Sequence, residues 1–130
     1  MSSIVKVDWD SKLPIYEISH LKLHKEGIKS LLIDVDGTLL SRQSSVIPAN
    51  VKKWIKESKK LFSLYLISNN PSKERIRRIA MELDIRYKSN AQKPRKKITL
   101  DVIAEMNEDS KNIAIIGDRI FTDVIVGNRC

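Results

Sequence analysis

The sequence predicts an α/β fold in which helices cover both faces of a parallel sheet. Apolar runs of strand length occur at 28–35, 61–67, 84–88 and 112–117, of which the third is the weakest. Between them lie segments with helical patterning, and each begins after a proline: Pro48, Pro71 and Pro94. Strands and helices that alternate along a chain form a parallel sheet covered on both faces.

The helices are identified by apolar side chains that recur three or four positions apart, so that they share one face. Residues 41–48 lack such a pattern and are predicted to form a loop. The apolar faces, in chain order, consist of Val51, Trp54 and Ile55, then Ile76, Ile79, Ala80 and Leu83, then Ile98, Val102 and Met106.

The length of 130 residues fits a single domain, 1–130. We expect residues 27–130 to form its core and residues 1–26 an N-terminal extension. Cys130 is the one cysteine, so no disulfide can form within the chain, which suits a reducing compartment such as the cytoplasm. No apolar run is long enough to span a membrane.

The formal net charge of +8 favours an anionic partner, such as a phosphate ester, an anionic lipid surface or nucleic acid. Lysine-rich helix faces on an ordinary soluble protein would explain the same charge almost as well. Aromatic residues make up only 5% of the chain, which disfavours stacking against single-stranded nucleic acid.

Polar residues follow three of the predicted strands at the point where each strand ends. In an open parallel sheet, ligands bind beyond the carboxyl ends of the strands, where the loops converge. The candidate site residues are therefore Asp34, Asp36, Gly37 and Thr38 after the first strand, Ser68 and Asn69 after the second, and Asp118 after the last.

The segment Asp34-Val35-Asp36-Gly37-Thr38-Leu39-Leu40 resembles the nucleophile motif of haloacid dehalogenase phosphatases. The resemblance implies that Asp34 attacks phosphorus and forms an aspartyl-phosphate. Asp36 would protonate the leaving oxygen and then deprotonate the hydrolytic water. Gly37 would let the backbone turn tightly beside the phosphate. Taken alone, the segment also fits an ordinary Asp-Gly turn at the end of a strand.

Three further segments resemble the remaining motifs of these phosphatases, in the same order. Ser68 would donate to a phosphoryl oxygen, and Lys93, before a predicted helix, would neutralise charge on the phosphoryl group. Asp118 would bind Mg²⁺ with the Asp34 carboxylate and the Asp36 carbonyl, and Asp123 would support that metal shell. The phosphate would be bound by Gly37, Thr38, Ser68, Asn69 and Lys93.

Each of these segments has an ordinary structural explanation when it stands alone. Ser68 and Asn69 fit a loop or a helix cap, Lys93 fits a solvated lysine, and Asp118 fits a turn. Four motifs in order, each at a strand end or a helix start, favour a magnesium-dependent phosphatase. The resemblance implies a three-layer Rossmann-like sheet over residues 28–128.

The spacing between motifs leaves no room for the cap domain that many members of the superfamily carry. Only 33 residues separate Asp34 from Ser68, and 24 separate Ser68 from Lys93. A capless site is open, which implies a large substrate or shielding by another chain. Because members of the superfamily continue into a further strand after the fourth motif, one interpretation of the end at Cys130 is truncation.

The flanking residues resemble the YqeG-type branch, which includes mitochondrial phosphatidylglycerophosphate phosphatases. The resemblance rests on Leu13-Pro14-Ile15-Tyr16, on Gly27-Ile28-Lys29 and on Gly127-Asn128-Arg129, whereas Gly37 departs from the asparagine typical of that branch. It implies hydrolysis of a phosphate monoester, with a phosphorylated lipid at a membrane surface as the leading substrate. Alternatives are a nucleic-acid end phosphatase, a phosphoprotein phosphatase, and a catalytically weak binding protein; the oligomeric state stays open.

His20 and His24 lie four positions apart on a predicted helix. They could share a metal ion, but no third ligand is evident, so a solvated helix face is the favoured interpretation.

Overall fold

The computed structural model describes residues 14–68, 70, 72–89 and 95–117. Its elements confirm the predicted alternation of strands and helices. In chain order they are η1 (Ile15–Glu17), α1 (His20–Lys25), β1 (Ser30–Asp34), α2 (Ala49–Lys59), β2 (Ser63–Ser68), α3 (Lys73–Leu83), β3 (Arg86–Ser89), α4 (Arg95–Met106), η2 (Ser110–Asn112) and β4 (Ile113–Ile116).

The described strands form one parallel sheet in the order β3-β2-β1-β4, as the sequence predicts. Strand β1 is central, and every one of its residues is buried. Its last residue, Asp34, is level with Ile67 of β2, and Ile33 is level with Ile116 of β4. The carboxyl ends of these three strands therefore lie at the same edge of the sheet.

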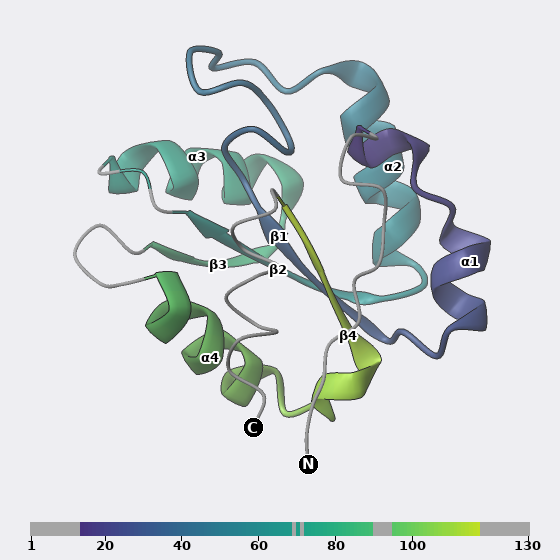
Figure 1. The fold of residues 1–130 in the computed structure, drawn as a ribbon. Coiled ribbons are helices and arrows are strands. Elements are labelled where there is room, and N and C mark those ends of the chain that lie inside the picture. Colours follow the sequence, from purple (N-terminus) through teal and green to yellow (C-terminus); the bar gives the residue numbers. More distant parts are fainter. Residues whose placement is uncertain (1–13, 69, 71, 90–94, 118–130) are drawn as a thin grey trace.

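The two faces of the sheet belong to separate apolar clusters, because alternate side chains of a strand point to opposite faces. Leu31 and Ile33 pack into the larger cluster, which takes in the buried faces of α2 and α3. Leu32 packs into the smaller cluster with Val102 of α4. Figure 1 shows α2 and α3 on one side of the sheet and α4 on the other, which is the predicted three-layer arrangement.

The segment before β1 contributes to the larger cluster, since Ile15, Ile18 and Leu23 are buried in it. The indole Nε1 of Trp54 in α2 donates to the carbonyl oxygen of Ile18 at 3.0 Å. Figure 1 shows α1 beside α2. No helix in the described ranges is long and apolar enough to cross a bilayer.

The expectation of a solvated face for both histidines of α1 was wrong for His20. Its Nε2 lies 2.7 Å from Ser58 Oγ, and its ring stacks on Trp54 with the centroids 4.6 Å apart. Burial lowers the pKa of His20 below its usual value, while the nearby Glu57 carboxylate opposes part of that shift. His24 is exposed, as predicted.

Candidate active site

The chain turns sharply just beyond β1. The amide of Val35 donates to the carbonyl of Ile67 at 3.1 Å, so the ladder continues for one residue after Asp34. The amides of Thr38 and Leu39 then both donate to the carbonyl of Val35, at 3.2 and 2.9 Å. Gly37 has a φ of 87°, in the left-handed region that glycine enters without a steric penalty. This turn holds the segment from Asp34 to Thr38 at the carboxyl edge of the sheet.

The two acidic residues of this segment are both largely shielded from solvent, Asp34 in the strand and Asp36 in the turn. Asp34 closes a fully buried strand and is 5% exposed. Asp36 lies in the turn, with its side chain 9% exposed. A carboxylate that merely closed a strand in an Asp-Gly turn would usually be solvated, because removing its charge from water is costly. Asp34 is therefore an unusually buried carboxylate for the end of a strand, and its role in catalysis stays a prediction.

Ser68, the last residue of β2, lies against the Asp36 carboxyl group. Its hydroxyl donates to Asp36 Oδ2 over a long 3.4 Å and accepts from the amide of Asn70 at 3.1 Å. Ser68 is 3% exposed. The structure thus brings together two of the residues that the sequence predicted for one site.

Arg75 of α3 also contacts this site and was not among the predicted residues. Its Nε donates to Asp36 Oδ1 at 3.0 Å, and its Nη2 lies 2.9 Å from the same oxygen. The Ser72 hydroxyl caps α3 by accepting from the amide of Arg75 at 3.2 Å, which fixes the first helical turn at the sheet edge. In the sequence, the signal for this contact is a basic residue in the first turn of the helix that follows Ser68.

Several predicted site residues lie outside the described residues: Asn69, Lys93, Asp118 and Asp123. Strand β4 nevertheless shows where the fourth motif joins the sheet. Because Ile116 is level with Ile33, Gly117 follows β4 beside the position of Asp34 in β1. The residue before Asp118 therefore lies at the same edge as the first two motifs. Of the remaining predicted residues, Gly37 is exposed and Thr38 is partly exposed.

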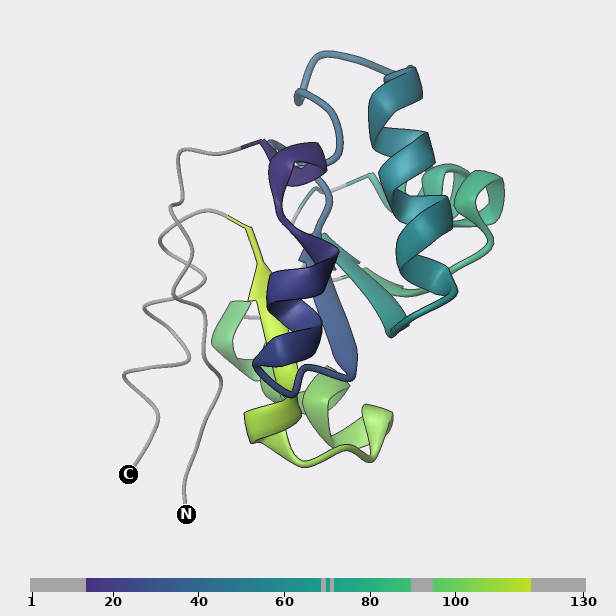
Figure 2. The ribbon, with the colours of Figure 1, turned by 90° about the vertical axis from the view of Figure 1, so that its right-hand side faces the viewer.

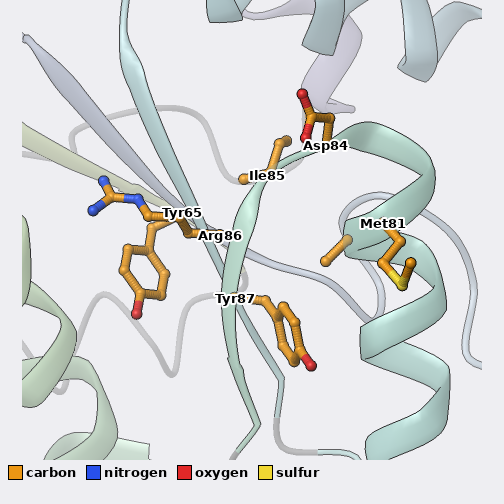
Figure 3. A pocket seen from close by; sticks show the side chains of 7 residues that line it. Tyr65, Met81, Asp84, Ile85, Arg86 and Tyr87 are labelled. Atoms are coloured by element: carbon orange, nitrogen blue, oxygen red, sulfur yellow. The ribbon is translucent and has the colours of Figure 1, made fainter.

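A hollow of about 520 Å³ lies elsewhere, around strand β3 and the end of α3. It is lined by Tyr65, Ala80, Met81, Asp84, Ile85, Arg86 and Tyr87. Figure 3 shows Tyr65 and Arg86 on one side of the strand and Met81 and Tyr87 on the other. None of these residues belongs to the four motifs, so this hollow is separate from the candidate active site.

One lining residue of the hollow is held by charged neighbours. The Tyr65 hydroxyl donates to the Glu105 carboxylate, and Lys88 donates to the other oxygen of Glu105 at 2.9 Å. Burial, together with that hydrogen bond, raises the pKa of Tyr65 to about 12. Tyr65 therefore stays protonated at neutral pH and acts as a structural donor.

The parallel three-layer fold and its sequence relatives define the chain as a phosphatase of the haloacid dehalogenase type. Residues 2–130 match the model of the family described as "Mitochondrial PGP phosphatase", and the chain belongs to that family. It is also 27% identical over 115 residues to "Probable phosphatase YqeG" of Bacillus subtilis (strain 168), covering 88% of this chain and 67% of that protein. No solved structure matches the chain.

These relationships confirm the predicted family and the predicted activity class, a phosphoric monoester hydrolase acting on a phosphorylated substrate. The roles of individual residues, the metal and the identity of the substrate stay predictions.

Proposed function

We propose that the chain hydrolyses a phosphate monoester through an aspartyl-phosphate formed on Asp34, with Mg²⁺ as its cofactor. The observation that carries this proposal is the meeting of Asp34, Asp36 and Ser68 at one edge of the sheet, with Asp34 and Ser68 both buried. A nucleophile, a proton donor and a phosphate ligand are the groups that such a reaction needs.

In the first step, an Asp34 carboxylate oxygen forms a bond to phosphorus while the bond from phosphorus to the ester oxygen breaks. Asp36 gives its proton to that leaving oxygen. In the second step, Asp36 takes a proton from water as the water oxygen attacks phosphorus, and the bond between phosphorus and Asp34 breaks. Inorganic phosphate leaves, and both carboxyl groups return to their starting states.

The described residues alone include no group of three or more His, Cys, Asp or Glu side chains that could hold a metal ion, so the proposed magnesium site also requires Asp118. Mg²⁺ prefers a small number of hard oxygen ligands, and the Asp34 carboxylate is such a ligand. The Asp36 side chain is occupied by Arg75 and Ser68, so its carbonyl oxygen is the better candidate ligand. Asp118 would complete the protein ligands, with Asp123 in support. When bound, the ion neutralises negative charge on the phosphoryl group.

Phosphatidylglycerophosphate is the substrate we favour. The family whose model matches this chain carries the description "Mitochondrial PGP phosphatase". Residues 35–62, between β1 and β2, hold one loop and α2, which supports a site without a cap. A lipid head group that projects from a membrane could reach such an open edge. A nucleic-acid end and a phosphoprotein are the competing substrates.

The test is phosphate release from a panel at matched concentrations: phosphatidylglycerophosphate in vesicles, a 5′-phosphorylated oligonucleotide and a phosphopeptide. We expect turnover of the lipid to be the fastest, to require Mg²⁺ and to stop in EDTA. Calcium should inhibit, because its longer bonds and higher coordination number misplace the nucleophile. If the oligonucleotide or the peptide is hydrolysed faster than the lipid, that compound becomes the favoured substrate in place of the lipid. Full activity after complete metal removal would refute the magnesium requirement.

A further inference from the structure

The guanidinium group of Arg75 is engaged at each of its nitrogens. Nε donates to Asp36 Oδ1 at 3.0 Å, Nη1 donates to the carbonyl of Ser44 at 2.6 Å, and Nη2 donates to the carbonyl of Ser41 at 2.9 Å. The side chain is 14% exposed. Because the guanidinium group is rigid and planar and donates to three partners, it fixes both the direction and the distance of each partner.

These contacts join parts of the chain that are distant in sequence. Arg75 and Asp36 are 39 positions apart, and the loop carbonyls belong to the connection between β1 and α2. Figures 1 and 2 show that connection at the top of the molecule, where it leads from β1 into α2. One side chain of α3 thus holds both the predicted proton donor and the loop that follows it.

We propose that Arg75 is a positioning residue that fixes the Asp36 carboxyl group for proton transfer, an inference that rests on the proposed function. Arg75 contacts Oδ1, whereas Ser68 contacts Oδ2 only through a long bond of 3.4 Å. Oδ1 is therefore the anchored oxygen, and Oδ2 is the oxygen that exchanges a proton with the leaving group and with water. Arg75 is thus assigned a role through Asp36, and its nitrogens already donate to Asp36, Ser44 and Ser41.

Arg78 provides a matched control on the same helix. Its Nη1 donates to the carbonyl of Ser45 at 3.3 Å, so it contacts the same loop as Arg75. The structure gives Arg78 no contact with Asp36 among the described residues. Replacing Arg78 removes a positive charge and a loop contact while leaving the Arg75–Asp36 pair intact.

The experiment compares kcat/KM for two soluble substrates that differ in leaving group, an aryl phosphate and an alkyl phosphate. The alkoxide that leaves from the alkyl phosphate must be protonated as it departs, whereas the nitrophenolate that leaves from the aryl phosphate departs readily without a proton. A defect in proton donation therefore slows hydrolysis of the alkyl ester selectively. The proteins are the parent chain, Arg75→Met, Arg75→Lys, Asp36→Asn, the Asp36→Asn/Arg75→Met double variant and Arg78→Met. The inhibition constant of inorganic phosphate is measured for each as a readout of phosphate binding.

We expect Arg75→Met to lower kcat/KM for the alkyl ester by about 10²-fold, the scale of a misplaced catalytic group, and to change the aryl rate far less. Asp36→Asn should show the same selectivity, and the double variant should be no slower than Asp36→Asn alone. Phosphate inhibition should be unchanged in Arg75→Met, and Arg78→Met should behave as the parent. Arg75→Lys, which keeps the charge, should recover part of the alkyl rate and serves as the comparison if Arg75→Met does not fold.

Equal losses on both esters, or weaker inhibition by phosphate in the Arg75 variants, would overturn the inference while leaving the proposed function intact. The first result would indicate a general structural role, and the second a role as a phosphate ligand. An inactive parent chain, or an Asp36→Asn variant with the parent's alkyl rate, would instead overturn the proposed mechanism, and the role of Arg75 with it.

Discussion

Asp34 and Ser68 are the most deeply buried of the predicted site residues that the structure describes, exposed by 5% and 3%. Burial removes competing water and strengthens each electrostatic interaction that a bound phosphoryl group would make. Asp36 is held from two directions, by Ser68 and by Arg75. A site whose polar groups are buried and mutually bonded is fixed before substrate arrives, which lowers the reorganisation needed for reaction.

We predict that Asp34→Asn abolishes turnover, because an amide cannot form the acyl-phosphate and is a poorer ligand for Mg²⁺. The measurement is phosphate release under saturating substrate. Asp84→Asn makes the same chemical change at an exposed position, with a side chain 97% exposed, and should keep the parent rate. Activity above a few per cent in the Asp34 variant would rule out covalent catalysis at this residue.

The secondary-structure elements divide into those that the sequence predicts strongly and those that it predicts weakly. Strands β1, β2 and β4 are apolar because both of their faces are buried, so their positions were predicted to within about two residues. Strand β3 is an edge strand with exposed Arg86 and Tyr87, which explains its weak signal.

The site was predictable where it depends on local sequence and not where it depends on packing between elements. Asp34, Asp36 and Ser68 each end or follow a strand, and the parallel sheet brings such positions together. The contact of Arg75 with Asp36 depends on how α3 sits against the sheet, which local spacing does not specify. The same reason explains His20, whose burial depends on the docking of α1 against α2.

At the element level, we predict that the docking of α1 makes stability sensitive to acid. The pKa of His20 is lowered in the folded chain, so the unfolded chain binds more protons as the pH falls below about 6.5. The free energy of unfolding should therefore decrease from pH 7 to pH 5. Denaturant titrations at these pH values measure it.

His20→Phe keeps a ring against Trp54 and removes the titrating group, so it should flatten this pH dependence. His24→Gln changes the exposed histidine of the same helix and should retain the parent's slope. If the His20→Phe protein and the parent lose stability equally on acidification, His20 is not the source of the effect.

For the molecule as a whole, some of the 24 lysine and arginine side chains are engaged by the protein's own groups, although the excess of +8 over the 16 acidic residues remains. Residues 86–97 contain six basic residues and no acidic residue. Within this basic run, the guanidinium of Arg86 lies 4.8 Å from the ring centroid of Tyr65. Lys88 pairs with Glu105 at 2.9 Å, and Lys97 pairs with Asp101 at 3.2 Å. Part of the positive charge that the sequence displays is therefore already engaged by the protein's own groups.

We predict that neutralising Arg95, Lys96 and Lys97 to glutamine weakens binding to anionic vesicles and slows turnover of a phosphorylated lipid. Each basic residue near an anionic surface contributes about 1 kcal/mol of attraction, and salt screens it. Hydrolysis of a soluble aryl phosphate should be unaffected, because these three residues are not assigned to the catalytic set. Vesicle sedimentation at low and high salt measures binding.

The matched control neutralises Lys53, Lys56 and Lys60, which are exposed on or next to α2. It changes the net charge by the same amount at a different place. If both triple variants lose vesicle binding equally, overall charge and not the segment 95–97 attracts the membrane. If the 95–97 variant hydrolyses the lipid as fast as the parent at low salt, these three residues have no role in lipid turnover.

The order of strands in the sheet also affects how the chain is made. Strand β1 can pair with β2 once residue 68 has been synthesised, but its other edge pairs with β4, at Ile113–Ile116. At about 5–20 residues per second, that edge stays open on the ribosome for roughly 2–10 s. An apolar strand with an unpaired edge is a template for aggregation. Newly made chains are therefore exposed to aggregation at this edge until β4 emerges and pairs with β1.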